Sequence, residues 1–202
     1  YDMVPQVQDS MERLVKKNVS AEVSDFNDFV SIWNNAEQKM ILVGANPPHA
    51  IEQKYLDLFA EDPSVILLTE TTSNLHHPSF FTSIDSIVAP IEKSENRKEL
   101  FETLRPEILL TFGGLIVSKK IKAFLREYIP KYHWHIDPKK ANNTFFGLTH
   151  HFKENPNTFF ESLLSKVQKY PSDYFSFWNS IKKNYELKRE QYIHNIPFSD
   201  ML

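Results

Sequence analysis

A pair of glycines and a pair of lysines stand close together in the stretch ILLTFGGLIVSKKIKAFL. The chain holds only four glycines, and two of them, Gly113 and Gly114, follow an apolar run. Lys119 and Lys120 come directly after Ser118, at an expected helix start. Backbone N–H groups at a helix start, together with ammonium groups, bind carboxylates and phosphates. We therefore predict that these five residues form a substrate site for an anion.

The position of the two lysines is not explained by local helix stability. A cation in the first turn opposes the helix macrodipole and costs a few tenths of a kcal/mol to about 1 kcal/mol. Lys119 and Lys120 are therefore candidates for a binding role. The alternative is that the helix starts one turn away, in which case both are ordinary solvated side chains.

Other kinds of site lack their sequence patterns. The turn GANPP differs from the dinucleotide-binding pattern GxGxxG, and GGLIVSKK differs from the phosphate-binding pattern GxxxxGK[ST]. No GxSxG or HExxH occurs, and the chain has no cysteine. His133, His135 and Asp137 share one face of an expected strand, but alternate histidines are common in strands without a metal. We predict no catalytic residue, cofactor-binding residue or metal ligand in this chain.

The composition restricts the class of protein. The 202 residues carry 41% hydrophobic and 24% charged side chains, with a formal net charge of −3. This balance is typical of a folded globular domain and opposes a broad nucleic-acid-binding surface. No apolar run reaches the roughly 18–20 residues that span a bilayer, and the absence of cysteine suits the cytoplasm. We expect a cytoplasmic protein that binds neither membranes nor nucleic acid.

Apolar runs alternate with helical patterns along the chain. Strands are predicted at residues 40–44, 64–70, 107–112, 132–137 and 144–149. Helices are predicted at residues 24–37, 49–62, 84–88, 96–104, 118–128, 156–169 and 172–192. This order predicts an α/β, Rossmann-like three-layer domain with a mostly parallel central sheet.

Glycines lie where such a fold binds its ligands. Gly44 and the Gly113-Gly114 pair follow predicted strands, and Gly147 lies inside another. In open α/β sheets, ligands bind outside the carboxyl ends of the strands. We therefore expect the site in the loops that contain Gly44 and Gly113-Gly114.

Both ends of the sequence have the character of linkers. Residues 1–23 are polar and weakly periodic, the sequence starts at Tyr1 rather than Met, and no signal peptide is evident. Residues 171–202 contain a helix followed by a second break at Pro197. We predict a domain at residues 24–170, a linker from a missing amino-terminal domain at residues 1–23, and a helix and linker toward a missing carboxy-terminal domain at residues 171–202.

Four stretches together resemble one enzyme family: ETTSNLHHPSF, RPEILLTFGGLIVSKKIKAFLRE, YHWHIDPKKANNTF and NIPFSDML. They are similar to the central domain of the 2-succinyl-5-enolpyruvyl-6-hydroxy-3-cyclohexene-1-carboxylate synthases, the MenD family of menaquinone biosynthesis. The resemblance implies a three-domain transferase that uses thiamine diphosphate and Mg²⁺. Such an enzyme decarboxylates 2-oxoglutarate and adds the succinyl-semialdehyde unit to isochorismate. The amino- and carboxy-terminal domains of the family bind the pyrimidine and the diphosphate of the cofactor.

The resemblance also assigns a role to the lysine pair. A Lys-Arg pair at this helix start helps the family to bind isochorismate, so the role falls on Lys119 and Lys120. Lysine at the second position keeps the charge but loses the planar fork of arginine. The cofactor-activating glutamate and the GDG-type Mg²⁺ motif belong to the other two domains, and no GDG occurs here. The fragment alone is therefore expected to hold no cofactor and to be inactive, whereas the full enzyme is expected to be a homo-oligomer.

Two alternatives remain open from the residues. One is the central domain of another thiamine-diphosphate enzyme, such as a relative of acetolactate synthase, in which this domain can bind a nucleotide. The absence of a glycine-rich dinucleotide loop opposes it. The other is a free-standing Rossmann-like module that binds a small anion, which the two linker-like ends oppose.

Overall fold

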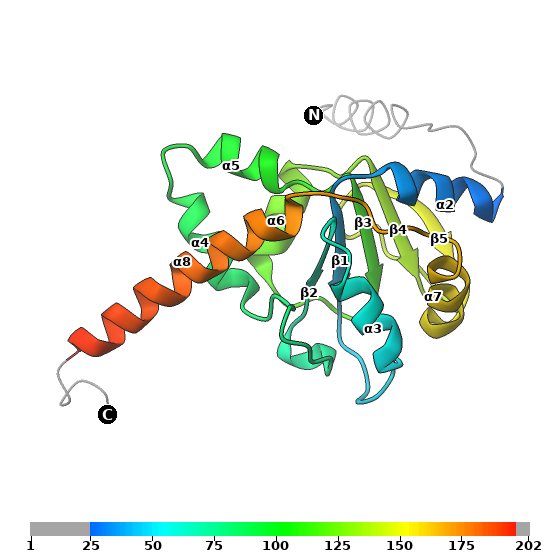
Figure 1. The fold of residues 1–202 in the computed structure, drawn as a ribbon, viewed down its shortest axis with the longest axis horizontal. Helices are drawn as coiled ribbons and strands as arrows, with labels where there is room; N and C mark the ends of the chain where they lie inside the picture. Colours follow the sequence, from blue (N-terminus) through cyan, green and yellow to red (C-terminus); the bar gives the residue numbers. More distant parts are fainter. Residues whose placement is uncertain (1–24, 197–202) are drawn as a thin grey trace, which may run out of the picture.

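A five-stranded, wholly parallel β-sheet forms the centre of the protein (Figure 1). The computed structural model describes residues 25–196. The strands are β1 (Lys39–Val43), β2 (Val65–Leu68), β3 (Ile108–Phe112), β4 (Tyr132–Ile136) and β5 (Leu148–Phe152). Their order across the sheet is β2-β1-β3-β4-β5. The expected α/β class with a parallel central sheet is confirmed.

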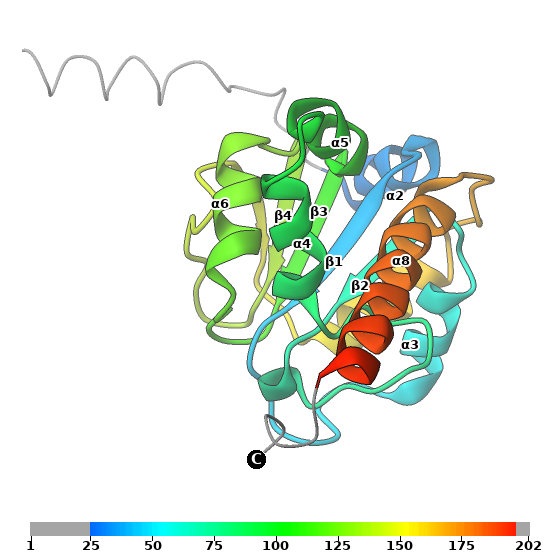
Figure 2. The same ribbon diagram turned by 90° about the vertical axis from the view of Figure 1, so that its left-hand side faces the viewer.

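Helices cover both faces of the sheet and give the domain three layers (Figure 1), and Figure 2 looks onto one of the two helical layers. The helices on one face are α2 (Phe26–Asn35), α3 (Gln53–Ala60) and α7 (Pro156–Leu164). Those on the other face are α4 (Ile84–Glu92), α5 (Arg97–Leu104), α6 (Lys119–Glu127) and α8 (Tyr174–Asn195). A short 3₁₀ helix, η1 (Thr71–Ser73), follows β2.

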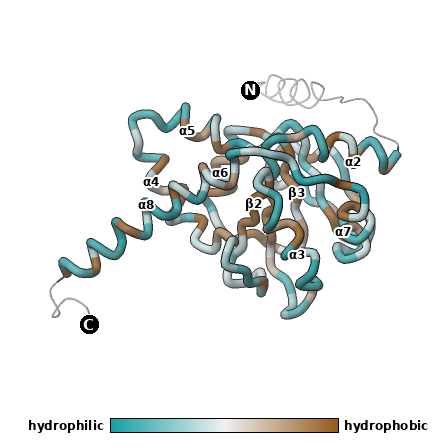
Figure 3. The backbone as a smooth tube through the Cα atoms, viewed as in Figure 1, coloured by the Kyte–Doolittle hydropathy of each residue, from teal (hydrophilic) through white to brown (hydrophobic). Residues whose placement is uncertain are grey.

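The strands are apolar on both faces because each face has its own helical layer. In β1, Ile41 and Val43 pack toward α2, α3 and α7, whereas Met40 and Leu42 pack toward the opposite layer. Full burial of one such aliphatic side chain contributes about 1.5–3 kcal/mol. Figure 3 shows the result as hydrophobic colour along the strands and hydrophilic colour over much of the outer surface. Continuous apolar runs therefore marked the strands in the sequence.

The fifth strand lies further along the chain than predicted. It was expected at residues 144–149, but β5 runs over Leu148–Phe152. Phe146 has a positive φ of 60°, which is incompatible with a strand. The Asn143 side chain also accepts a hydrogen bond from the N–H of Leu148, at 2.9 Å, and closes a turn before the strand. Gly147 therefore precedes β5 rather than lying inside it.

Several helices differ in length from their predictions; α3, for example, was expected at residues 49–62 and spans Gln53–Ala60. Helix α4 was expected at residues 84–88 and continues to Glu92, with Pro90 inside it. Helix α7 was expected to reach residue 169 but ends at Leu164. Its C-cap is Ser165, whose N–H donates to the carbonyl of Glu161. Such differences are common because helix ends depend on capping and tertiary contacts.

Helix α8 begins in the core and then leaves it. Tyr174 and Trp178 are buried beside β2 and α4, whereas Leu187 and Tyr192 further along are 58% and 69% exposed. Figure 1 shows the second half of α8 projecting from the body of the domain. The domain division at residue 170 stays a prediction, and the linkers predicted at residues 1–23 and at the end of the chain lie outside the described residues, apart from α8 itself. Within residues 25–196, no helix combines the length and apolar character needed to cross a bilayer.

Candidate functional site

The loops after β1 and β3 close the crevice in which doubly wound folds usually bind ligands. The chain reverses its direction across the sheet between β1 and β3, and ligands usually bind at this switch point. Here the N–H of Gly44 donates to Phe112, at 2.9 Å, and the N–H of Gly114 donates to Ala45, at 2.7 Å. A Cβ on Gly44 would lie only 2.1 Å from the carbonyl oxygen of Gly114. The two loops touch backbone to backbone.

Gly113 is required for the same contact. Its φ is +81°, and an added Cβ would lie 2.6 Å from the side-chain nitrogen of Asn46. Glycine is the residue that takes this conformation without strain. The glycine pair is thus explained by the close approach of two loops, and its predicted part in substrate binding stays a prediction.

The lysine pair stands at the predicted helix position. Helix α6 starts at Lys119, and the hydroxyl of Ser118 accepts the N–H of Ile121, at 3.1 Å, as an N-cap. The alternative of a helix that starts a turn away is therefore wrong. Lys119 is exposed, whereas the half-buried Lys120 forms an ion pair with Glu92 on α4.

A carboxylate already occupies the amino end of α6. Glu70, just after β2, accepts the N–H of Val117 at 2.8 and 3.0 Å and the N–H of Ser118 at 2.6 Å. A negative charge at a helix start is stabilised by the macrodipole, whereas the adjacent lysines are not. Glu70 therefore offsets the unfavourable position of Lys119 and Lys120, and it also takes up N–H groups that were expected to face a ligand.

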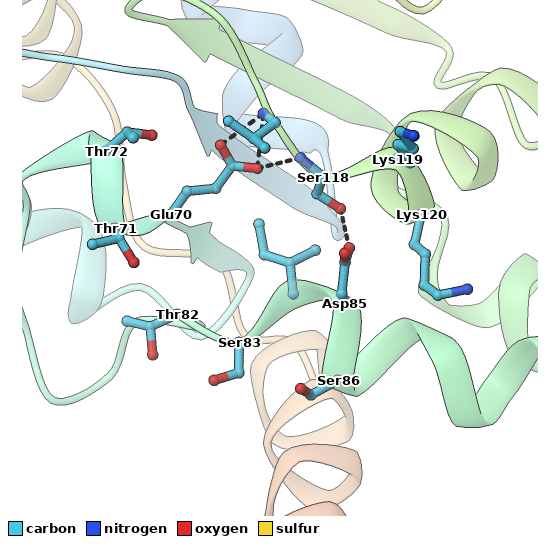
Figure 4. Close-up of a pocket in the computed structure, with 12 residues that line it drawn as sticks. Glu70, Thr71, Thr72, Thr82, Ser83, Asp85, Ser86, Ser118, Lys119 and Lys120 are labelled. Carbon is cyan, nitrogen blue, oxygen red and sulfur yellow. Dashed lines mark hydrogen bonds between the residues drawn. The ribbon is translucent and has the colours of Figure 1, made fainter.

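An open cavity of about 710 Å³ lies beside this helix start (Figure 4). Its wall comes from the η1 segment, the start of α4 and the start of α6, and Asp85 of α4 bonds the Ser118 hydroxyl. Figure 4 shows the Glu70 carboxylate directed at the backbone before α6 and Lys120 extending toward α4. The lining residues are Glu70, Thr71, Thr72, Thr82, Ser83, Ile84, Asp85, Ser86, Val117, Ser118, Lys119 and Lys120. Hydroxyl and ammonium donors thus surround a space large enough for a small metabolite.

The five predicted site residues fall into two groups. Ser118, Lys119 and Lys120 line this first cavity, whereas Gly113 and Gly114 line a second cavity of about 470 Å³. The structure therefore does not bring the five residues into one site.

Sequence reasoning missed Glu70 and Asp85. Glu70 lies in the polar stretch ETTSN, at the end of the strand predicted at residues 64–70, and Asp85 lies further along, in the stretch TSIDS. The first stretch served only as part of a family motif, and no role was assigned to Glu70. Its position at the carboxyl end of an apolar run was the available signal.

The second cavity lies at the carboxyl ends of β3 and β4 and has a buried polar floor. The hydroxyl of Thr111 lies 2.9 Å from Nε2 of His133 and 2.8 Å from Nδ1 of His135. Burial, with a smaller contribution from His135, lowers the pKa of His133 to about 3, so its imidazole is neutral at physiological pH. Within the described part of the chain, no group of three or more His, Asp or Glu side chains is placed to hold a metal ion.

Several relatives that match this chain carry the same name. No family profile matches the chain. It is 56% identical over 174 residues to the 2-succinyl-5-enolpyruvyl-6-hydroxy-3-cyclohexene-1-carboxylate synthase of Christiangramia forsetii. The aligned region covers 86% of this chain and 30% of that protein. The chain is 49% identical over 179 residues to the synthase of the same name from Flavobacterium johnsoniae. That aligned region covers 88% of this chain and 31% of that protein.

The chain belongs to this synthase family. More distant family members align as well: the Porphyromonas gingivalis synthase is 28% identical over 195 residues, or 92% of this chain and 32% of that protein. The chain thus spans about a third of the length of the synthases that it matches. The family membership expected from the sequence motifs is confirmed.

Proposed function

We propose that this chain is the central domain of a 2-succinyl-5-enolpyruvyl-6-hydroxy-3-cyclohexene-1-carboxylate synthase that acts in menaquinone biosynthesis. The complete enzyme decarboxylates 2-oxoglutarate with thiamine diphosphate and Mg²⁺ and adds the succinyl-semialdehyde unit to isochorismate. The observation that carries this proposal is the identity of 56% over 174 residues with a synthase of that name. The three-layer, all-parallel fold supports it, since this is the architecture expected of the central domain.

The described residues do not suit the cofactor itself. The first cavity has two carboxylates, but Glu70 is engaged by backbone N–H groups and Asp85 by the Ser118 hydroxyl. Mg²⁺ prefers several carboxylate and water oxygens in octahedral geometry. We therefore place thiamine diphosphate and Mg²⁺ on the other domains of the enzyme, and we propose that the complete enzyme is a cytoplasmic homo-oligomer.

In this proposal the first cavity supplies part of the isochorismate site. The exposed ammonium of Lys119 attracts a carboxylate of the substrate, and Lys120 exchanges its ion pair with Glu92 for a second contact. Ser118 fixes the start of α6 through its cap, and Gly113 and Gly114 set the course of the loop that leads to it. The lysines bind and orient the substrate, and no proton transfer is assigned to them.

The proposal is tested in the full-length enzyme with Lys119→Ala, Lys120→Ala and Lys120→Arg. The alanine variants are expected to raise the KM for isochorismate about tenfold or more, because each removes a charged contact to the substrate. Decarboxylation of 2-oxoglutarate is expected to change little. Lys120→Arg is expected to retain most of the activity, because the charge is kept.

Two controls separate substrate binding from stability. Lys98→Ala removes an exposed lysine on α5 and is expected to leave the kinetics unchanged. Glu92→Gln breaks the same ion pair as Lys120→Ala but leaves the ammonium in place. If Glu92→Gln and Lys120→Ala behave alike, and Lys119→Ala behaves as wild type, the lysines have only a structural role. Tight binding of thiamine diphosphate by the 202-residue chain would contradict the placement of the cofactor.

A further inference from the structure

The second cavity is electrostatically unlike the first. It is lined by three cationic side chains, Lys122, Arg126 and Lys140, and by one carboxylate, Asp137. The first cavity balances two lysines against two carboxylates. The two cavities share no lining residue, although α6 contributes to both. The excess positive charge makes the second cavity the more favourable place for an anion.

Two of its cations are held in position. Lys122 and Arg126 lie one turn apart on α6, so they are on the same side of the helix. The ammonium of Lys122 donates to the carbonyl of Ile116 at 3.1 Å, and Nε of Arg126 donates to the carbonyl of Thr144 at 2.9 Å. The Arg126 guanidinium also lies 4.9 Å from the centre of the Phe146 ring. Each cation keeps further N–H donors for a ligand, and the fixed geometry reduces the entropy lost on binding.

The carboxylate of Asp137 offsets only one of the three positive charges. Its oxygen accepts the N–H of Lys139 at 2.7 Å and the N–H of Lys140 at 2.9 Å. Burial alone raises the pKa of Asp137, but these hydrogen bonds and the neighbouring histidines lower it below its usual value. The carboxylate is therefore ionised and engaged with the loop that follows β4.

An incomplete hydrogen-bond chain lies at the floor of the cavity. His133 lines the cavity and is only 1% exposed, and its Nδ1 has no partner among residues 25–196. The Thr111 hydroxyl donates either to the carbonyl of Trp134, at 3.3 Å, or to Nε2 of His133; in the second arrangement it also accepts Nδ1–H of His135. His133 then carries its proton on Nδ1. A buried N–H without an acceptor is unfavourable, and an anion in the cavity can supply one.

We propose that the second cavity binds a small oxyanion, a carboxylate or a phosphate group, between Lys122 and Arg126, with His133 as a neutral N–H donor. The two cations attract the negative charge of the oxyanion, and the neutral N–H of His133 orients the oxyanion through a hydrogen bond. The proposal does not depend on the function proposed above, because it involves neither Lys119 nor Lys120.

Binding is tested on the 202-residue chain with two probes, inorganic phosphate and succinate. The imidazole ¹⁵N and ¹H signals of His133 are followed by NMR during each titration. We expect a saturable shift of the Nδ1 signal with at least one probe. Saturation by phosphate alone identifies a phosphate site, and saturation by succinate alone identifies a carboxylate site.

Charge variants decide where the anion binds. The double variant Lys122→Gln/Arg126→Gln is expected to weaken binding about tenfold or more, which corresponds to the loss of at least one charged contact. The control Lys98→Gln/Lys153→Gln removes the same number of exposed charges elsewhere and is expected to change the dissociation constant less than about twofold. If the first variant does not fold, Lys140→Gln in the exposed loop replaces it.

Two results overturn the proposal. One is the absence of a saturable His133 shift with both anions. The other is an equal loss of affinity in the cavity variant and in the control, which would indicate only a response to net charge. No substrate of the synthase enters this assay, so its failure leaves the proposed function untouched.

Discussion

Burial fixes the protonation state of His133. The imidazole ring is packed near Phe145 and bonded to Thr111, and the charged form has no solvent to stabilise it. Its pKa is lowered to about 3, whereas a histidine in an unfolded chain titrates near 6.5. Between these two values the unfolded state binds a proton that the folded state does not. The contribution of His133 to stability is therefore present above the unfolded pKa and is lost as the pH falls through this range.

His133→Gln is predicted to remove this pH dependence. From about pH 7 to about pH 5, the free energy of unfolding of the wild type should fall relative to that of the variant by about 2 kcal/mol. Urea denaturation at a series of pH values measures the difference. His76→Gln, which removes an exposed imidazole, serves as the control and should follow the wild type. Parallel curves for wild type and His133→Gln would show that His133 is not the buried neutral group described here.

At the scale of elements, the start of α6 depends on residues that are distant in the sequence. Glu70 lies 48 residues before Ser118, yet its carboxylate accepts two of the N–H groups that precede the helix. Asp85 holds the capping hydroxyl from a third segment. The loop after β2, helix α4 and helix α6 are thus joined at one point, beside the first cavity.

Replacement of Glu70 tests this joint. Glu70→Ala leaves the exposed N–H of Val117 and the partly buried N–H of Ser118 without an acceptor and is predicted to cost about 1–3 kcal/mol of unfolding free energy. Glu70→Gln keeps one oxygen acceptor and should cost less. Glu102→Ala, which breaks an exposed ion pair with Arg105, should cost about 0.5 kcal/mol or less. Equal stabilities of the three variants in urea denaturation would contradict the role of Glu70.

This joint also shows where sequence-based prediction stops. The central strands were found because both of their faces are buried, so that each appears as a continuous apolar run. The start of α6 was found from the helical pattern that begins at Ser118, which the structure shows to be the N-cap. Neither pattern reveals which carboxylate reaches the helix, since that contact forms only when β2 and β3 are placed in the sheet. The cationic second cavity was missed for the same reason, because its lysine, arginine and histidines come from separate elements.

At the scale of the whole molecule, a buried charge cluster joins several segments at the amino end of β1. Lys39 is fully buried, with its ammonium 2.6 Å from the Ser64 hydroxyl and 3.7 Å from the carboxylate of Asp62. The same ammonium lies over the rings of Trp33 and Tyr170, at 5.5 and 5.6 Å. Burial lowers the pKa of Lys39, an effect that Asp62 opposes. Helix α2, strand β1, the turn before β2 and the segment after α7 therefore meet at one ammonium group.

Breaking this pair from one side is predicted to be more harmful than removing it. Asp62→Asn leaves the charge of Lys39 uncompensated and should cost about 3–5 kcal/mol of unfolding free energy. Adding Lys39→Met, which removes the charge but keeps much of the volume, should recover part of that loss. A double-mutant cycle in urea measures the coupling. Strictly additive effects would show that the two groups do not compensate each other.

The contact between Gly44 and Gly114 has a further consequence for how the sheet assembles. The pairing of β1 with β3 is poorly specified by hydrophobicity, because every residue of both strands is buried and no alternation of buried and exposed positions marks the alignment. In the native alignment Val43 lies opposite Phe112, and the next residue along β1 touches the backbone of Gly114. A slip of one residue would bring Val43 or Ala45 into that contact, where no side chain fits. Because Gly44 has no Cβ atom, it fits this contact where its neighbours do not, and it thereby selects the native alignment of the two central strands.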